Sequence, residues 1–345
     1  MKKIIIWWGR SDPTYSRNQI LRKILRQLNY KIIDFYPYIS YFGYIQALFQ
    51  IKTKPCAIWV PCFRQRDIHS ASKWAKKNSI PLIFDPLISS WDKQVGERKK
   101  FLPNSFLSEK LKKKESQIFN KADFLIADTE AHKNFFNEIF NFPKNKIFTI
   151  NVGADEKFFF PDFSKNKIHN EILFYGSFLE LHGIDTILEA AKLTINKKIK
   201  WTLLGNYNKY KFNNLPSNIH LEKTIAISKL RQRIIKSTIL LGIFSSSEKG
   251  NNVIPNKVFQ SLACGKPVIT RKADAYPKEI IDEKMGIYFV EPNNPNALAQ
   301  KVIDILKDNK KILNNSKEAY KTFINFFSNK KIEKQIKVLL NEIKN

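Results

Sequence analysis

The residues best suited to chemistry lie between Gly242 and Thr270, in the stretch GIFSSSEKGNNVIPNKVFQSLACGKPVIT. This stretch begins as a short apolar run, passes through a polar loop, enters a helical pattern at Pro255 and leaves through Gly265 into a second apolar run. The pattern predicts a strand, a loop, a helix and another strand. In open α/β sheets a strand-to-helix loop of this kind lies at the carboxyl edge, where ligands bind.

Three loops of the second half are expected to converge at that edge, at residues 176–183, 205–210 and 245–257. The first and third open onto helix N-termini, whose free backbone N–H groups bind anions. Lys257 brings a positive charge to this edge, and His182 can donate a hydrogen bond to a phosphate. Together they predict a diphosphate site, although alone Lys257 could be a surface lysine and His182 a capping or packing residue.

Asp85 is a further candidate, in the first half of the chain. It directly follows the apolar run Leu82–Phe84, so its carboxylate is expected at the ligand edge of its sheet. Two interpretations stay open for it: Asp85 orients an acceptor, or it caps the loop that it begins.

The elements that must position these residues alternate between strands and helices. The first half predicts strands at 4–8, 32–35, 57–60, 82–84 and 124–127, and a second β–α series begins at Ile172. Such alternation predicts two parallel, doubly wound sheets, with a linker in the charged, turn-rich segment 152–171. The loop after the first strand lacks GxGxxG spacing, which argues against NAD.

The segment from Phe35 to Ile51 is dense in aromatic residues and is followed by Lys52 and Lys54. One interpretation is a core helix with an aromatic face. The other is an interfacial helix whose rings enter a bilayer.

Composition narrows the class of protein. The chain of 345 residues is long enough for two domains, and its net charge of +28 should attract anionic lipid, phosphorylated small molecules or nucleic acid. Nucleic acid is disfavoured because the chain has neither zinc-finger spacing nor an RNP-like aromatic motif. Its three cysteines form no CxxC pair, and no histidine cluster completes a metal site, so we expect no metal and a reducing compartment. The opening apolar run is too short for a signal peptide, and no run approaches the roughly 20 residues that cross a bilayer.

The chain resembles glycosyltransferases of family 4, which have the GT-B fold. The matching stretches are GRSDPTYSRNQILRKIL, DPLISSWD, FLIADTEAHKNFF and NVGADEKFF in the first half, with YGSFLELHGIDTILEAA and VIPNKVFQSLACGKPVIT in the second. The resemblance implies an α/β protein with two Rossmann-like, doubly wound parallel-sheet domains facing a central cleft. It assigns residues 1–155 to an acceptor-binding domain, joined by a C-terminal helix at about 328–345, and residues 168–327 to a domain that binds a nucleotide-sugar.

The resemblance also implies an activity. The expected enzyme is a retaining glycosyltransferase that moves a hexose-type sugar from a UDP- or GDP-sugar to a glycan or lipid-linked acceptor in cell-surface polysaccharide synthesis. It is expected to need no metal and no cofactor, because the nucleotide-sugar is a substrate. We expect it in the cytoplasm or, through an anionic membrane surface, at the inner face of the plasma membrane.

The family's motifs assign the donor site to the loop Gly176–Gly183, with Ser177 and His182 at the positions where family members commonly have an Arg and a Lys for the diphosphate. Without a metal, charge on the leaving group must be stabilised by helix N-termini and cations. Lys257 is the first candidate for that catalytic role, and His182 is the second.

Two donor-binding positions depart from the family. Members usually have an acid that contacts the donor sugar and, eight positions later, a Glu that holds the ribose. Here these positions are Asn252 and Gln260, although Glu248 lies just upstream and could replace the first. A neutral amide binds ribose more weakly than a carboxylate. An alternative therefore stays open: a catalytically degenerate GT-B protein that binds a sugar nucleotide or a partner without transfer.

Overall fold

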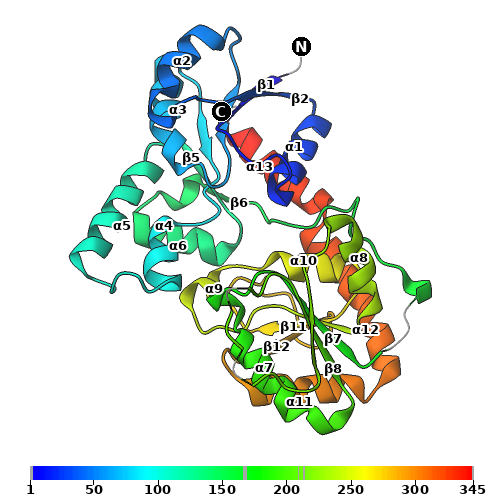
Figure 1. Ribbon diagram of the computed structural model, residues 1–345. Helices are drawn as coiled ribbons and strands as arrows, with labels where there is room; N and C mark the ends of the chain where they lie inside the picture. Colours follow the sequence, from blue (N-terminus) through cyan, green and yellow to red (C-terminus); the bar gives the residue numbers. More distant parts are fainter. Residues whose placement is uncertain (1–2, 166–168, 209, 213, 344–345) are drawn as a thin grey trace. The chain divides into compact units, whose positions relative to one another are not determined.

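The computed structural model describes residues 3–165, 169–208, 210–212 and 214–343, and the chain folds into two compact units (Figure 1). Unit 1 contains Met1–Val152 and Ile332–Asn345, and unit 2 contains Gly153–Lys331. Residues 166–168, where the predicted linker meets the start of the predicted second domain, lie outside the described residues, as does Lys209 of the predicted loop 205–210.

Unit 1 is built on a six-stranded, wholly parallel sheet in the order β2-β1-β3-β4-β5-β6. β1 pairs with both β2 and β3, so the chain starts inside the sheet and then extends it in both directions. The predicted doubly wound sheet is confirmed. The strands are β1 (Lys3–Trp8), β2 (Tyr30–Phe35), β3 (Ala57–Val60), β4 (Leu82–Phe84), β5 (Phe124–Ala127) and β6 (Ile147–Thr149).

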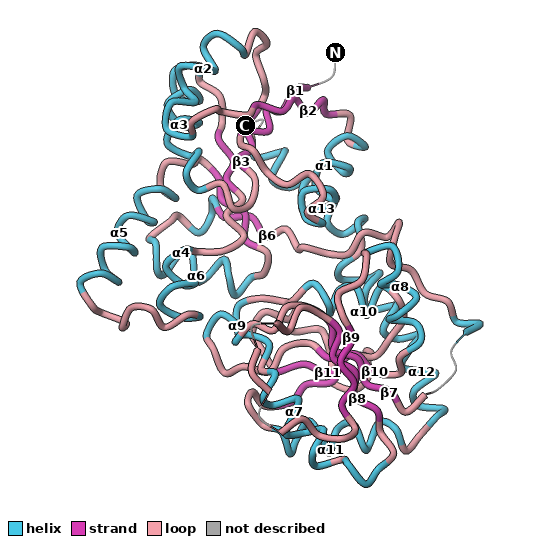
Figure 2. Tube along the Cα trace, viewed as in Figure 1, coloured by secondary structure: helices cyan, strands magenta, loops and turns pink. Residues whose placement is uncertain are grey.

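Helices cover both faces of this sheet, and Figure 2 shows the strands inside the unit with the helices around them. They are α1 (Ser16–Gln27), α2 (Gly43–Gln50), α3 (Ile68–Asn78), α4 (Ser90–Asp92), α5 (Phe106–Phe119), α6 (Glu130–Phe140) and α13 (Asn329–Glu342), with short helical turns η1 (Ser40–Phe42), η2 (Gln65–Asp67), η3 (Lys93–Glu97) and η4 (Lys144–Lys146).

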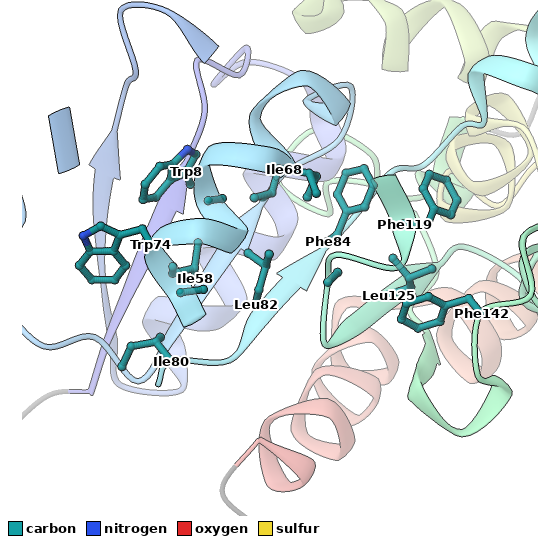
Figure 3. Packing of buried hydrophobic residues seen from close by; sticks show 14 of the residues in the cluster. Trp8, Ile58, Ile68, Trp74, Ile80, Leu82, Phe84, Phe119, Leu125 and Phe142 are labelled. Carbon is teal, nitrogen blue, oxygen red and sulfur yellow. The ribbon is translucent and has the colours of Figure 1, made fainter. Parts of the chain in front are cut away.

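Successive residues of the unit 1 strands enter different cores, because side chains alternate between the two faces of a sheet. On one face Trp8 and Phe84 pack against α3, α5 and α6 (Figure 3). On the other face Trp7 and Trp59 pack against α1 and against residues 332–340 of α13. Burial on both faces explains why these strands are continuous apolar runs.

Unit 2 repeats this architecture with the strand order β12-β11-β10-β7-β8-β9, again wholly parallel. Its strands are β7 (Glu171–Tyr175), β8 (Lys200–Leu204), β9 (Ile219–Glu222), β10 (Ile239–Leu241), β11 (Val268–Arg271) and β12 (Ile287–Val290). Its helices are α7 (Ile184–Leu193), α8 (Ile227–Lys236), α9 (Glu248–Asn252), α10 (Asn256–Ala263), α11 (Pro295–Leu306) and α12 (Asn309–Thr322), with turns η5 (Phe163–Lys165), η6 (Glu180–His182), η7 (Ile195–Lys197) and η8 (Phe323–Phe327). In the core, α7 and α11 pack on one face of the sheet.

The segment 35–51 differs from the core helix with an aromatic face that was one of its two interpretations. Only Gly43–Gln50 forms an α-helix, and its buried residues are Gly43 and Ala47. Tyr38, Phe42 and Phe49 expose 78, 62 and 70% of their surfaces. The core interpretation is wrong, since the aromatic face is not covered by the rest of unit 1. Judged by length and apolar content, none of the helices in the described ranges could cross a bilayer.

Candidate functional site

The candidate site lies at the carboxyl edge of the unit 2 sheet, where the loops after three neighbouring strands meet. β7 lies between β10 and β8, and the chain adds strands on one side of β7 before it crosses to the other. Such a reversal of strand order leaves a crevice in which α/β proteins bind ligands. The predicted loops at 176–183, 205–210 and 245–257 follow these three strands.

Two glycines allow the loops to approach one another closely. A Cβ on Gly205 would lie 1.9 Å from the carbonyl oxygen of Gly176, so no side chain fits at this position. Gly183, with φ +64°, would place a Cβ 2.9 Å from the backbone nitrogen of Ser245. The backbone of Phe244 also donates a hydrogen bond to the carbonyl of His182, at 3.2 Å. The loops that follow β7 and β10 are therefore held side by side.

Lys257 extends from α10 into the space between these loops. Its side chain is 5% exposed, and its Nζ has no hydrogen-bond partner in the part of the chain that is described. Nζ lies 4.0 Å from the centroid of the Phe174 ring and 3.4 Å from where a Cβ on Gly176 would be. Burial lowers the pKa of Lys257 well below its usual value. A buried amine without an acceptor is costly, and an anion in this space would supply one.

His182 lies beside Lys257, with its ring packed edge-on against Phe174. Its Nδ1 donates to the carbonyl oxygen of Ser177, which can only accept, so the lone pair of the neutral imidazole is on Nε2. Burial, followed by repulsion from Lys257, lowers the pKa of His182 to about 2. The expected hydrogen bond from His182 to a phosphate therefore needs a second proton on the ring, which a bound anion favours.

Two helices that begin at these loops have uncapped N-termini. α7 begins after Gly183 and α10 begins after Pro255, and neither N-cap residue provides a side-chain hydrogen bond. The first N–H groups of both helices can therefore bind an anion. α9 is different, because the Ser247 hydroxyl accepts from the backbone N–H of Gly250.

Gln260 is buried one turn along α10 from Lys257. The Tyr175 hydroxyl donates to Gln260 Oε1 at 2.9 Å and also approaches the carbonyl oxygen of Lys257, at 3.3 Å. Sequence reasoning missed Tyr175. The available signal was its hydroxyl, which comes at the very end of a buried strand and directly before Gly176.

Glu248 and Asn252 lie at the two ends of α9, in a stretch predicted to be a polar loop. Glu248 is exposed, and Asn252 is partly buried. Arg271, which sequence reasoning also missed, holds the start of this loop: its Nη1 donates to the carbonyl oxygens of Ser245 and Ser247, at 2.6 and 2.9 Å. A charged residue that ends a buried strand was the signal for it.

Asp85 belongs to unit 1, where it follows β4 and is fully buried. Arg17 Nε donates to its Oδ2 at 2.7 Å, and Arg17 Nη1 donates to the carbonyl oxygen of Ile150 at 3.0 Å. Burial raises the pKa of Asp85, against the opposing effect of Arg17. Asp85 therefore connects α1 to the carboxyl end of its sheet through Arg17, a partner that the sequence did not reveal. Among the described residues no three His, Cys, Asp or Glu side chains gather as a metal ion would require.

Comparison with known sequences places unit 2 in a family. Residues 155–322 match the family described as glycosyl transferases group 1. The chain is 27% identical over 222 residues to the uncharacterized glycosyltransferase MJ1069 of Methanocaldococcus jannaschii, covering 56% of this chain and 51% of that protein. It is 26% identical over 212 residues to MJ1178 of the same organism, covering 59% of this chain and 56% of the relative. The chain thus spans about half the length of these relatives.

Solved structures are similar over almost the whole chain. The HepE protein of Anabaena, in complex with UDP, has a TM-score of 0.72 and 14% identity, covering 99% of this chain and 100% of that chain. Sucrose-phosphate synthase from Thermosynechococcus elongatus has a TM-score of 0.77 and 15% identity, covering 99% of each chain. At these identities the matches show the fold. With the two parallel sheets, they confirm the expected GT-B class.

Proposed function

We propose that this chain, which belongs to the group 1 glycosyltransferases, moves a sugar from a UDP- or GDP-sugar to a glycan or lipid-linked acceptor. The observation that carries the proposal is the Lys257 amine, which is buried beside Phe174 and Gly176 and has no hydrogen-bond partner among the described residues. A nucleoside diphosphate carries the anionic oxygens that this position lacks.

In the proposed reaction the bond between the sugar C1 and the diphosphate oxygen breaks, and an acceptor hydroxyl forms a new bond to C1 and loses its proton. The leaving diphosphate gains negative charge as this happens. Lys257 and the uncapped N-termini of α7 and α10 are positioned to stabilise that charge. From the family resemblance we propose that the sugar keeps its anomeric configuration.

Donor binding is the first step to test. Purified protein is heated with a panel of UDP, GDP, UDP-sugars and GDP-sugars, starting with UDP-glucose, with which the Anabaena protein was solved. A ligand at 100 times its Kd should stabilise the fold by about 2.7 kcal/mol. If none of the nucleotides raises the Tm, the proposal is wrong.

The proposed class of acceptor has a consequence for where the reaction takes place. A lipid-linked or polysaccharide acceptor would place the reaction at the cytoplasmic side of a membrane. Cys56, Cys62 and Cys264 are thiols outside any disulfide, which suits a reducing compartment. Transfer from the donor selected above to undecaprenyl-phosphate-linked glycans, followed by NMR of the anomeric proton, would test the acceptor and the retained configuration together.

One observation favours a second candidate, a protein that binds the nucleotide-sugar without transferring it. Gln260 holds the position at which the family resemblance implies a Glu, and its oxygen already accepts from Tyr175. Under this alternative the donor would protect the fold, but the protein would neither hydrolyse nor transfer it.

The substitution Gln260→Glu separates the two candidates. Glu keeps an acceptor for the Tyr175 hydroxyl and adds a charge that strengthens hydrogen bonds to ribose hydroxyls, so the affinity for nucleosides should rise about tenfold. Activity that appears only in this variant would support the degenerate protein. Activity in the natural chain excludes it. Gln260→Leu, which removes the polar group, is the control for a purely structural effect.

A further inference from the structure

Unit 1 carries an exposed apolar surface, whereas the donor site belongs to unit 2. We call this surface the aromatic patch; it comprises the loop after β2, η1 and α2. Each of its large apolar side chains exposes at least 38% of its surface. Its members are Tyr36, Tyr38, Ile39, Tyr41, Phe42, Ile45, Leu48 and Phe49.

The way in which α2 packs explains why these side chains face outward. α2 lies beside α3 (Figure 1), and its small residues Gly43 and Ala47 form the buried side. A Cβ on Gly43 would lie 2.8 Å from Pro37 Cβ and 3.0 Å from Ser70 Oγ, so the helix sits close to its neighbours there. Ile45 and the residues three and four positions after it, Leu48 and Phe49, then fall on the opposite side of α2. Tyr38, Tyr41 and Phe42 precede α2 and are exposed as well.

The surroundings of the patch are basic. Residues 36–84 contain seven Lys and Arg residues and a single acid, Asp67. Asp67 is fully buried and accepts from Arg64 Nε at 2.5 Å. The nearest acid before the patch, Asp34, accepts two hydrogen bonds from Arg22. The cations that remain exposed are Lys52, Lys54, Arg66, Lys73, Lys76 and Lys77.

We infer that the aromatic patch is a docking surface for an anionic lipid bilayer. Tyrosine and phenylalanine rings partition into the boundary between head groups and acyl chains, and lysines at their rim are attracted to anionic head groups. Apolar patches of this kind on soluble units mark interaction sites. The cationic rim without free acids selects an anionic partner, and α2, with eight residues, lies on a bilayer rather than spanning it.

This inference goes beyond the proposed function and does not depend on it. The patch belongs to unit 1, and the donor site belongs to unit 2. Membrane binding can therefore be present without sugar transfer, and sugar transfer without membrane binding.

Cosedimentation of the full chain with lipid vesicles tests the inference. The probes are vesicles of phosphatidylcholine alone and of phosphatidylcholine mixed with phosphatidylglycerol. We expect binding to the mixed vesicles and weak binding to phosphatidylcholine. The double variant Phe42→Ser/Phe49→Ser should lower the partition coefficient by about tenfold or more, because two exposed rings are lost from the lipid contact. Lys52→Glu/Lys54→Glu should weaken binding to the mixed vesicles only.

The matched control is Leu193→Ser/Ile195→Ser, which removes two exposed apolar side chains from unit 2. It should bind vesicles as the natural chain does. All variants are checked for an unchanged Tm and for nucleotide protection, so a folding defect is distinguished from a docking defect.

Three results would overturn the inference. The natural chain could fail to bind the mixed vesicles, or Phe42→Ser/Phe49→Ser could bind them as well as the control does. Light scattering could also show that the natural chain is a dimer and that Phe42→Ser/Phe49→Ser is a monomer, which would assign the aromatic patch to a second copy of the chain.

Discussion

Lys257 combines a cost to folding with a proposed benefit to binding, and this combination can be tested with one substitution. Lys257→Met keeps the length and packing of the side chain but removes the buried, unpartnered amine. An unsatisfied buried donor costs roughly 1–3 kcal/mol. We predict that Lys257→Met raises the Tm at neutral pH and loses most nucleotide protection. Thermal unfolding with and without the best nucleotide measures both effects.

The gain in stability has a defined dependence on pH. The folded-state pKa of Lys257 is lowered, so the unfolded chain binds the proton more tightly, and protonation favours unfolding. The loss of folding stability that protonation of Lys257 causes is absent above the unfolded-state pKa of about 10.4. It grows as the pH falls toward the folded-state pKa. Lys257→Met should therefore gain more stability at neutral pH than at about pH 10.5. A destabilised Met variant would show that the amine has a partner in solution.

Nucleotide affinity should also depend on pH through Lys257. The bound diphosphate raises the pKa that burial lowers, so binding takes up a proton between the two pKa values and affinity falls as the pH rises through that interval. Calorimetry above about pH 7.5, where a terminal phosphate with a pKa of about 6 is fully ionised, isolates the contribution of the protein. Measuring the binding enthalpy in two buffers with different ionisation enthalpies gives the number of protons that the complex takes up on binding. Lys257→Met should remove the dependence, whereas a flat profile in the natural chain would contradict it.

At the residue scale the sequence revealed types and order but not partners. The position of Lys257 after a strand-to-helix loop was sufficient to predict it at the carboxyl edge. Its isolation from acceptors was not predictable, because that depends on which side chains of β7 point toward α10. Arg17 and Asp85 illustrate the same limit, since 68 residues separate the two members of one buried ion pair.

Among the elements, the loops after β7 and β10 depend on Gly183 for their contact. Gly183→Ala adds a Cβ 2.9 Å from the backbone of Phe244 and Ser245, at a φ of +64° that disfavours alanine. We predict a loss of about 1–3 kcal/mol of stability and a nucleotide affinity at least tenfold lower, because the loops must separate. Differential scanning fluorimetry with a nucleotide titration measures both.

Gly265→Ala is the matched control for this prediction. Gly265 has a similar φ of +66°, but its added Cβ would meet the Phe163 ring at 3.0 Å and the Ser316 carbonyl oxygen at 3.2 Å, not the site loops. It should lose stability and keep its nucleotide affinity. Equal affinities for the two variants would mean that the contact at Gly183 does not shape the site.

Segment 35–51 shows what an amphipathic pattern leaves undetermined. An amphipathic helix is present at Gly43–Gln50, with Ile45, Leu48 and Phe49 exposed, but most of the aromatic residues of the segment precede this helix. The period specifies that the face exists, but it does not specify what covers the face. Burial against the sheet depends on the neighbouring helices, and here the buried residues of α2 are the small Gly43 and Ala47.

At the scale of the whole molecule, the alternation of strands and helices predicted both parallel sheets, because each βα unit is encoded locally. The contribution of the chain's end to unit 1 is not local. Ile332, Ile336 and Leu339 of α13 are fully buried in the core that contains Trp7, Trp59 and α1. Periodicity shows only that α13 has an apolar side. The family resemblance assigned a C-terminal helix to the first domain, and in the structure this side lies in the core of unit 1.

This packing predicts that a substitution near the C-terminus weakens the N-terminal sheet. Ile336→Ala removes fully buried methyl groups and should cost about 2–5 kcal/mol. Compared with the natural chain, the variant should exchange amide hydrogens faster in peptides from β1 and α1 and at the same rate in peptides from β7 and β8. The reason is that the cavity lies in the core of unit 1. Val338→Ala, two residues away on the same helix and 60% exposed, should leave all four segments unchanged. If the substitution accelerates exchange in β7 and β8 and leaves β1 unchanged, this end of α13 belongs to unit 2 instead.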